Sequence, residues 1–534
     1  MCVSSRIKYP VGVQTFSEIV TEGYLYVDKT ELVYNLAGSN KYIFLSRPRR
    51  FGKSLLISTL EAYFQGRREL FKGLALERLE NEWAEHPVLR LDLATDSYES
   101  VDKLRGVLSS LLTIWEEKYG VSPDGNNSVA MRFSRVIRTA AQTTGRRVVI
   151  LVDEYDKPVI DSLHDSELQE KIRQYLQGFY SVIKASDEYI RFGMLTGVGK
   201  FAHLSIFSGL NNLNDVSMDY SYNSICGITE GEMHEYFGAS VKNFAAANSI
   251  TEEETWERFK KHYDGYHFSQ DGEDIYNPFS VLNAFTKGRI GDYWFRSGTP
   301  SFLVKLLRRN RFPLIKLEGQ LRSESQLSDI TDSSRDIVPL LFQAGYLTLR
   351  GWDERRRKYL LEFPNREVYS GFWESLVDAY FPVTISSDGL DVFTLVDQLT
   401  AGSVDSFMVS IKSLISSATS EHIPDKEEHF QNMMAIICRM LGLETRTEIH
   451  SSQGRCDMTV ACAGYVYIFE FKIDGSAGKA LDQILERGYA DPYMSDSREK
   501  ILVGANFSTE TRTLTDWVSE RLIFPTIQNI RDKR

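Results

Sequence analysis

The sequence contains few cysteines and no long apolar run. Its 534 residues include only five cysteines, and these form neither a CxxC pair nor a pattern with histidine at ligand spacing, which argues against a zinc site or a disulfide framework. No segment stays apolar for the roughly 20 residues that cross a bilayer. The N-terminal residues also lack the apolar core of a signal peptide. We therefore expect a cytoplasmic protein with no membrane partner.

Positive charge is in the minority. Acidic residues outnumber basic ones by 73 to 62, and the formal net charge is −11. This balance argues against a protein that coats nucleic acid, although an acidic chain can still carry one basic groove. The composition is globular and has no low-complexity tract, and the length suggests about three domains.

The most informative stretch of the chain runs from Tyr42 to Leu56. Its apolar start predicts a strand, and Gly52, Lys53 and Ser54 follow a short basic loop at the start of a helix. In a phosphate-binding loop, backbone N–H groups point at the phosphates, a lysine reaches the terminal ones and a hydroxyl ligates magnesium. Lys53 and Ser54 fit the last two roles. The usual pattern has glycine where this chain has Arg47, so this motif alone leaves an ordinary strand-to-helix turn as the alternative.

A second motif lies further along the chain, at residues 148–156. A run of β-favouring apolar residues ends in the adjacent carboxylates Asp153 and Glu154. Such a run suits a parallel strand buried on both faces, and ligands collect at the carboxyl ends of such strands. Asp153 would lie by the magnesium ion, and Glu154 would orient or deprotonate the attacking water. Either motif alone has an ordinary structural alternative, but the two in this order predict a nucleotide site.

The pattern of the chain changes twice. Residues 1–285 alternate helical segments with apolar strand-like runs, at 42–45, 88–93, 148–152 and 189–196, as parallel βαβ units do. The last run ends in Thr196, whose hydroxyl would sense the phosphates between the two earlier strands. Residues 286–385 are mostly helical and suit a small winged-helix module, and residues 386–534 form a third region. We expect these three ranges to be three domains.

The third region carries a second group of chemically competent residues. Asp457 lies at the start of one predicted strand, while Glu470 and Lys472 lie two apart on the next strand and so point to the same face. The two carboxylates can hold a divalent metal, and the lysine can position or activate the water that attacks a phosphodiester. Inward-facing charges are costly unless they are paired or metal-bound. A structural ion pair is the alternative.

Short motifs along the chain match those of a known family. In the N-terminal and middle parts they are Gly12-Val-Gln-Thr-Phe16, Tyr26-Val-Asp-Lys-Thr30, Arg47-Pro-Arg-Arg-Phe-Gly-Lys-Ser54, Leu151-Val-Asp-Glu-Tyr-Asp156, Ile206-Phe-Ser-Gly-Leu-Asn-Asn-Leu213, Tyr263-Asp-Gly-Tyr-His-Phe268, Tyr276-Asn-Pro-Phe-Ser280 and Phe363-Pro-Asn-Arg-Glu-Val368. In the C-terminal part they are Gly454-Arg-Cys-Asp457, Glu470-Phe-Lys472, and Gln483 followed by Tyr489. Over almost its whole length the chain resembles the bacterial AAA-ATPase-like proteins that carry a C-terminal PD-(D/E)xK nuclease domain.

The resemblance implies an α/β chain with a P-loop NTPase domain, a middle helical or winged-helix segment, and a C-terminal restriction-endonuclease-like domain. Arg47 is the residue expected in this family, so it no longer weakens the phosphate-loop assignment. The C-terminal motifs resemble the RecB-like branch of these nucleases, although the spacing from Gln483 to Tyr489 is longer than that branch's i,i+4 pairing. The upstream acid of such nucleases is either Glu428, which helix-borne geometry favours, or Glu448.

We therefore expect an ATP-binding and ATP-hydrolysing module coupled to a metal-dependent nuclease. The expected nucleotide site comprises Arg49, Arg50, Gly52, Lys53, Ser54, Leu55, Asp153 and Thr196, with Glu154 acting on water and with Ser54 and Asp153 on magnesium. The expected nuclease residues are Asp457, Glu470, Lys472 and Gln483, with Glu428, Asp457 and Glu470 as metal ligands.

The cofactors expected with these sites are ATP and Mg²⁺, with Mn²⁺ as an alternative in the nuclease. The expected partner is nucleic acid, DNA rather than RNA. Two alternatives stay open. One is a nucleotide-controlled switch or scaffold that binds nucleic acid or a partner without cutting. The other is an ATP-driven translocase, which would ordinarily require several copies of the chain in an oligomeric ring.

Overall fold

The computed structural model describes residues 7–122, 127–163, 165–199, 213–298, 306–307, 312, 314, 317–328, 336–380, 392–417, 427–440, 443–451, 454–462 and 464–522. The chain forms two compact units: residues 1–298 with 321–368, and residues 299–320 with 369–534. The three-domain division at 285 and 385 stays a prediction. None of the described helices is long and apolar enough to span a membrane.

The first unit is built around a five-stranded parallel sheet. In order across the sheet, its strands are β2 (Val88–Asp92), β3 (Val148–Asp153), β4 (Ile190–Gly197), β1 (Tyr42–Ser46) and β5 (Asn214–Asp215). Neighbouring strands pair in parallel. β1 and β3 are buried along their whole length, as continuous apolar runs covered on both faces should be. Because β4 lies between β1 and β3, the carboxyl ends of these three strands lie side by side.

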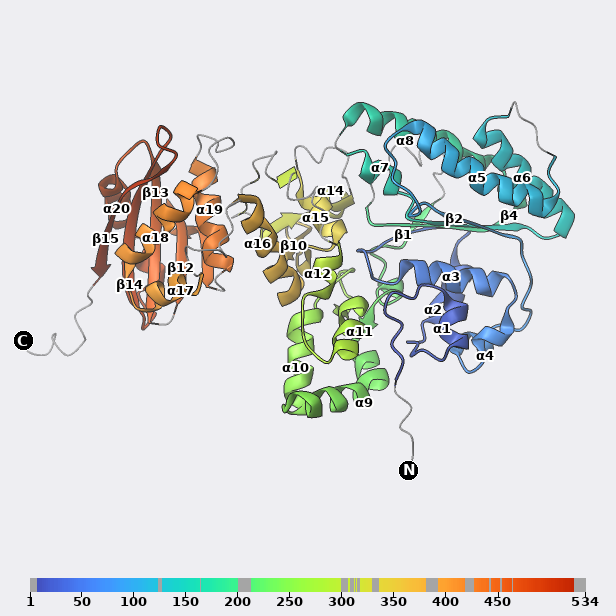
Figure 1. The fold of residues 1–534 in the computed structure, drawn as a ribbon, viewed down its shortest axis with the longest axis horizontal. Coiled ribbons are helices and arrows are strands. Elements are labelled where there is room, and N and C mark those ends of the chain that lie inside the picture. Colours follow the sequence, from blue (N-terminus) through green and yellow to red (C-terminus); the bar gives the residue numbers. More distant parts are fainter. Residues whose placement is uncertain are drawn as a thin grey trace, which may run out of the picture. The chain divides into compact units, whose positions relative to one another are not determined.

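Helices cover both faces of this sheet (Figure 1). One face carries α1 (Phe16–Thr21), α2 (Thr30–Ser39), α3 (Lys53–Phe64) and α4 (Ala75–Leu79), and the other carries α5 (Val101–Tyr119), α6 (Val129–Thr144), α7 (Lys157–Asp161) and α8 (Ser166–Ala185). The ends of α5 and α6 follow ordinary capping chemistry. Ser100 and Ser128 accept hydrogen bonds at their N-termini, and Gly120 and Gly145 end them in the left-handed conformation.

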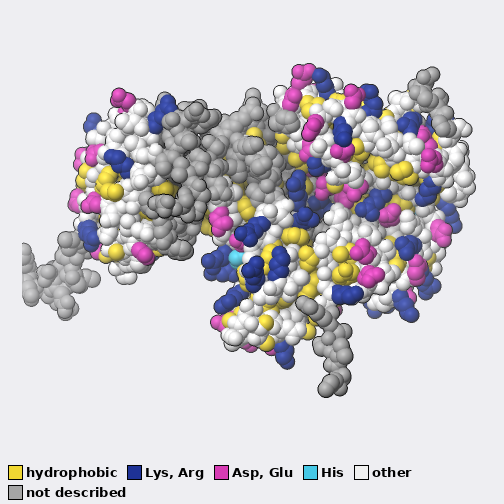
Figure 2. Space-filling view, in the orientation of Figure 1, with side chains coloured by type: hydrophobic (Ala, Val, Ile, Leu, Met, Phe, Trp, Pro, Cys, Tyr) yellow, Lys and Arg dark blue, Asp and Glu magenta, His cyan; other side chains and the backbone are white. Residues whose placement is uncertain are grey.

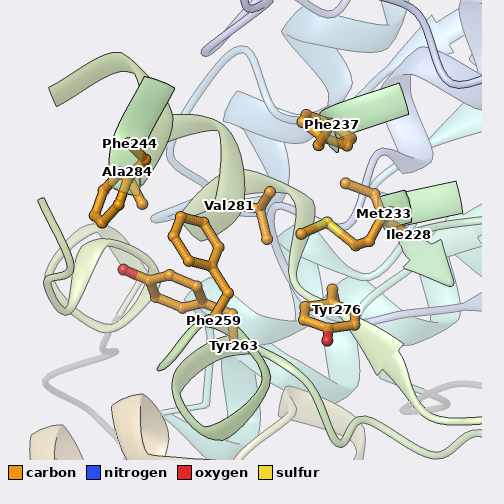
Figure 3. Packing of buried hydrophobic residues seen from close by; sticks show 9 residues of the cluster. All are labelled: Ile228, Met233, Phe237, Phe244, Phe259, Tyr263, Tyr276, Val281 and Ala284. Carbon is orange, nitrogen blue, oxygen red and sulfur yellow. The ribbon is translucent and has the colours of Figure 1, made fainter. Parts of the chain in front are cut away.

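A helical subdomain follows the sheet in the first unit. It contains α9 (Glu230–Asn248), α10 (Glu252–Tyr263), α11 (Pro278–Lys287) and the short strands β6 (Ile228–Thr229) and β7 (Ile275–Tyr276), followed by α12 (Tyr293–Gly298). Capping boxes start α9 and α10, formed by Thr229 with Glu232 and by Thr251 with Glu254. The apolar core shown in Figure 3 comprises Ile228, Met233, Phe237, Phe244, Phe259, Tyr263, Tyr276, Val281 and Ala284. This packing fixes the position of α11.

The segment from residue 320 to residue 362 has the element order of a winged helix. β8 (Gln320–Arg322) precedes α14 (Glu324–Ser328) and α15 (Val338–Ala344), and β9 (Thr348–Asp353) and β10 (Lys358–Glu362) form an antiparallel hairpin. The three strands form one sheet in the order β8-β10-β9. Gly345 ends α15 with a φ of 88°. This order of elements matches the module predicted for the middle of the chain.

The second unit is built around a five-stranded mixed sheet. Its strands, in order, are β11 (Glu444–Ser451), β12 (Gly454–Cys462), β13 (Tyr465–Ile473), β14 (Glu499–Ser508) and β15 (Thr513–Leu522). β13 and β14 pair in parallel through the crossover helix α20 (Ala477–Glu486), which packs against both, and the other pairs are antiparallel. The remaining helices are α16 (Arg366–Tyr380), which begins within the first unit, α17 (Val392–Thr400), α18 (Val404–Ser417) and α19 (Glu427–Met440). The sheets of the two units confirm the predicted α/β class.

Candidate active sites

The loop after β1 has the backbone geometry of a phosphate-binding loop. α3 begins at Lys53, and Gly52 before it has a φ of 95°, a left-handed conformation that glycine adopts without steric cost. Arg50 has a φ of 66°, so a second residue of the turn also lies in the left-handed region. Non-glycine residues in this region are strained and concentrate at functional sites. The turn therefore places the start of α3 beside a shaped cavity.

This cavity has a volume of about 340 Å³, which is in the range of small-molecule sites. The predicted nucleotide-binding residues that line it are Arg49, Arg50, Gly52, Lys53, Ser54 and Leu55, and Glu154 lines it as well. Two further segments close it, residues 10–14 and the part of α11 that contains Pro278, Phe279 and Leu282. Both overlap motifs that carried the family resemblance, at 12–16 and 276–280, but the sequence did not assign them a place in the site.

Lys53 is buried at the base of the loop. Its Nζ donates hydrogen bonds to the carbonyl oxygens of Arg47 at 2.9 Å and Pro48 at 3.0 Å. Burial lowers the pKa of Lys53 from its ordinary value, and nearby carboxylates oppose this shift, Glu154 most strongly. The carbonyl groups of the loop thus hold the ammonium group beside the cavity that Lys53 lines.

Arg47 has a structural reason to replace the usual glycine. Its buried guanidinium donates to the carbonyl oxygens of Ser46, Ser217 and Tyr222 at 2.9, 2.7 and 3.0 Å. It also lies 4.2 Å from the centre of the Phe268 ring. Burial lowers the pKa of Arg47 to about 10. Arg47 therefore braces the phosphate loop against distant segments of the unit.

The ends of β3 and β4 bring Asp153 and Thr196 together. Thr196 Oγ1 donates a hydrogen bond to Asp153 Oδ1 at 2.7 Å, and both side chains are buried. The contact follows from the strand order, because β3 and β4 are neighbours. The described lining of the 340 Å³ cavity contains Glu154 but neither Asp153 nor Thr196. Glu154 thus lies at the cavity wall, whereas Asp153 and Thr196 form a hydrogen-bonded pair that is not part of the described lining.

Asp156 is a buried acid to which the sequence assigned no role. Its Oδ2 accepts hydrogen bonds from the backbone N–H groups of Val198 at 2.9 Å and Gly199 at 2.7 Å. Burial raises the pKa of Asp156 to about 6. Glu154, two residues earlier, has a φ of 51°, which turns the chain between the two acids. Asp156 therefore fixes the segment after β4, whereas Glu154 is the acid that reaches the cavity.

In the second unit, β12, β13 and α20 bring the predicted nuclease residues together. Lys472 Nζ lies 3.1 Å from Glu470 Oε1, as the two-residue spacing along β13 predicted. Gln483 Nε2 donates to the same oxygen from α20. Asp457 Oδ2 accepts a hydrogen bond from Phe471 N at 2.8 Å, which places the Asp457 carboxylate beside that of Glu470. These side chains form one cluster, as Asp457, Glu470 and Lys472 were predicted to do.

Glu470 lies at the centre of this cluster. The residue is 2% exposed, and its pKa is raised to about 7, first by burial and then by Asp457, while Lys472 opposes the shift. Its Oε2 atom has no hydrogen-bond partner among the residues that the structure describes. A buried carboxylate oxygen without a partner is costly and rare. A bound cation would satisfy it, and the carboxylate donors suit Mg²⁺ or Mn²⁺.

The upstream acid lies where the structure gives no side chain. Glu428 falls in α19 and Glu448 in β11, but the side chains of both lie outside the described part of the chain. Within the described part, no group of three or more His, Cys, Asp or Glu side chains is placed to hold a metal ion. Glu428 as a metal ligand stays a prediction. Residues 206–212 of the family motif also lie outside the described residues.

Tyr489 joins the nuclease cluster despite its long spacing from Gln483. α20 ends at Glu486, and Gly488, with a φ of 57°, turns the chain back toward the helix. Gln483 Nε2 therefore also donates to Tyr489 OH, at 3.2 Å. The i,i+4 rule applies only within a helix, so it could not predict a contact made by a residue beyond the helix end.

The two units thus define an ATPase-like domain and a nuclease-like domain in one chain, and comparison with known proteins agrees. A family model described as "Predicted AAA-ATPase" matches residues 10–207, and one described as "PD-(D/E)XK nuclease superfamily" matches residues 425–517. The chain is 38% identical over 530 residues to an "Uncharacterized protein in vnfD 5'region" of Azotobacter chroococcum mcd 1, an alignment that covers 97% of this chain and 100% of the relative. The chain belongs to this family of AAA-ATPase-like proteins with a C-terminal PD-(D/E)XK nuclease superfamily domain, which confirms the resemblance.

Similarity to solved structures is weaker. The Aeropyrum pernix ORC1 protein, solved in complex with DNA, is 12% identical with a TM-score of 0.26, over 66% of this chain and 91% of that one. The Aeropyrum pernix ORC2 protein, solved as ADPNP–ADP complexes, is 10% identical with a TM-score of 0.18, over 65% of this chain and 93% of that one. Similarity at this level carries no argument about what the chain does.

Proposed function

We propose that this protein binds and hydrolyses ATP in its first unit and uses a divalent metal to cut nucleic acid with its second, acting on DNA rather than RNA in the cytoplasm. The observation that carries the proposal is the buried Glu470, with one unpartnered oxygen, beside Asp457, Lys472 and Gln483. Membership in a family with a nuclease-superfamily domain supports this interpretation over a structural ion pair.

In the nuclease site, each residue of the chain has a separate task. A divalent ion, when bound, polarises the phosphodiester and lowers the pKa of its water. Asp457 and Glu470 supply oxygen ligands, and Gln483 and Tyr489 keep the Glu470 carboxylate oriented. The Lys472 side chain is 31% exposed, so its ammonium group can hold the attacking water and stabilise negative charge on the phosphate.

In the nucleotide site, the chain would supply positive charge for the phosphates and two side chains that ligate magnesium. Lys53 would neutralise the terminal phosphates, and Arg49 or Arg50 would stabilise charge that develops on them. Ser54 and Asp153 would hold magnesium, with Thr196 orienting the Asp153 carboxylate through its 2.7 Å hydrogen bond. Glu154, at the cavity wall, would orient the attacking water.

Surface charge on the first unit supports a nucleic-acid partner. Figure 2 shows Lys and Arg side chains gathered over the region of α10, α11 and α12. Exposed basic residues of α10, of the turn after α11 and of α12 include Lys261, Arg289 and Arg296. A hydrogen bond between His262 and Asp292 joins the end of α10 to the start of α12, which keeps them together. A local basic surface on an acidic chain fits a phosphate backbone.

The proposal is tested by cleavage of labelled single- and double-stranded DNA and RNA with Mg²⁺ or Mn²⁺, with and without ATP. We expect cleavage by the wild type, loss of cleavage in Lys472→Ala, and loss of the response to ATP in Lys53→Ala. Lys479→Ala and Lys72→Ala are matched controls, because both lysines are exposed. Nucleic-acid binding and ATP turnover without cleavage under any condition would favour the switch or scaffold instead.

A further inference from the structure

A buried carboxylate lies in the first unit, outside both sites. Glu367, the second residue of α16, is fully buried. Its Oε1 accepts hydrogen bonds from Ser280 Oγ at 3.0 Å and from the backbone N–H of Trp294 at 2.7 Å. Its Oε2 has no hydrogen-bond partner within the described ranges. Two of the sequence motifs meet at this residue: 276–280, which also lines the nucleotide cavity, and 363–368, which has no role in either site.

Trp294 connects this carboxylate to the phosphate loop. The Trp294 side chain is buried, and its indole Nε1 donates a hydrogen bond to the carbonyl oxygen of Arg49 at 2.8 Å. Arg49 lines the nucleotide cavity. One residue therefore joins the loop, through its indole, to Glu367, through its backbone. The loop carbonyl cannot move far unless the indole follows or the hydrogen bond breaks.

The outer side of the loop is closely packed, which leaves it little room for independent movement. The Phe51 ring lies 4.7 Å from the Tyr266 ring, and the Trp294 ring lies 5.5 Å from the Tyr346 ring, measured between centroids. At Gly345, an added Cβ would lie 2.7 Å from the Pro48 side chain. Because close-packed interiors transmit displacement, a shift of the loop is passed to these neighbours.

Glu367 lies close to the point where the chain leaves the first unit, so its link through Trp294 to the phosphate loop reaches the start of α16. α16 begins at Arg366, and the chain passes from the first unit to the second after Val368. Glu367 is thus held by the start of α12 and by α11 at the point where the chain leaves the ATPase unit. A change in the Arg49 turn would act on the first residues of α16.

We propose that Trp294 and Glu367 are positioning residues of the nucleotide site, which tie the conformation of the phosphate loop to the start of α16. The proposal rests on nucleotide binding by this loop, as proposed above for the first unit. The coupling is carried by two hydrogen bonds in series, Arg49 to the Trp294 indole and the Trp294 backbone to Glu367. Energetic coupling of this kind requires a physical element that both ends bias.

The test is hydrogen exchange of the full-length protein with and without Mg-ATP. Trp294→Phe removes the indole N–H and keeps most of the ring packing. Trp352→Phe is the matched control, because Trp352 is a half-buried tryptophan in β9 whose ring centre lies 4.7 Å from that of Tyr359. In wild type and control we expect Mg-ATP to slow exchange about tenfold both in residues 52–56 and in residues 367–373. In Trp294→Phe the change at 52–56 should remain and the change at 367–373 should fall below about twofold.

The outcomes separate this inference from the nuclease proposal. An unchanged response of residues 367–373 in Trp294→Phe would overturn the coupling, as would a wild type that protects 52–56 and leaves 367–373 unaffected. If Mg-ATP protects neither segment of the wild type, nucleotide binding and the coupling both fail. Loss of the α16 response without any cleavage activity would support the coupling and refute only the nuclease. If Trp294→Phe does not fold, Glu367→Leu gives the same test, because it removes the carboxyl oxygen that accepts from the Trp294 backbone N–H.

Discussion

The buried Glu367 predicts an unusual dependence of stability on pH. Burial raises its pKa to about 8 and Asp292 adds to this, whereas hydrogen bonds from Ser280 and from the backbone of Trp294 oppose the shift. A carboxyl whose folded pKa lies above its unfolded value binds its proton more tightly in the folded state. The stabilisation is fully present below the unfolded pKa, near ~4.3, and is lost as the pH rises through about 8.

Glu367→Gln removes this titration and keeps an oxygen acceptor for Ser280 and Trp294. The shift of roughly three to four pKa units corresponds to about 4–5 kcal/mol in all, of which the wild type loses about 3.5 kcal/mol between about pH 5 and pH 8. The variant does not lose it. The free energy of unfolding of the variant relative to wild type should therefore rise by about 3.5 kcal/mol over this range. Urea titrations of the full chain at several pH values, with exchange of β3 and β4 amides reporting on the first unit, measure the difference.

The matched control is Glu354→Gln, which changes an exposed carboxylate in the turn between β9 and β10. It should show no such rise with pH. A difference between Glu367→Gln and wild type that stays constant across the range would refute the reasoning, because it would show that Glu367 keeps the same pKa in the folded and unfolded states.

Three further predictions concern the sites and the basic surface. Thr196→Val should reduce ATP turnover by about tenfold or more in steady-state assays, because it removes the hydrogen bond that orients the Asp153 carboxylate toward the metal. ATP affinity should change little, and Thr196→Ser should restore turnover. Tyr489→Phe should lower cleavage by about tenfold by loosening Gln483, with metal affinity read separately by calorimetric titration with Mn²⁺; unchanged cleavage would remove Tyr489 from the site. Arg289→Ala combined with Arg296→Ala should weaken nucleic-acid binding. It should also reduce the slope of log affinity against log salt concentration by about one for each phosphate that the protein no longer neutralises. An unchanged slope would show that this surface does not touch phosphate.

The sequence predicted those parts of the fold that depend on local pattern. The apolar run at 148–152 became β3, Val148–Asp153, and the run at 42–45 became β1, Tyr42–Ser46. The helix expected to carry Glu428 appears as α19, Glu427–Met440. These elements were predictable because a strand buried on both faces is a continuous apolar run, and a helix buried along one face has apolar residues at helical spacing.

Contacts between distant segments could not be predicted in the same way. Nothing in the residues near Arg47 indicates that its guanidinium reaches carbonyl groups at Ser217 and Tyr222. The hydrogen bonds that Trp294 makes with Arg49 and Glu367 also join residues far apart in the chain. Such pairings depend on how the helical subdomain packs on the sheet, which local patterns do not specify.

The two hydrogen bonds of Lys53 with carbonyl groups of its own loop have a consequence for ligand selection. The ammonium group already has two acceptors, at Arg47 and Pro48, so an incoming ligand must replace these partners rather than fill a vacant position. A neutral group gains little by such an exchange, because it offers acceptors no better than a carbonyl. A polyanionic phosphate would gain far more, since it adds direct attraction between opposite charges, which is strong in a buried site. We therefore expect the proposed nucleotide site to discriminate against nucleosides and against weakly charged mimics before any contact with the base is made.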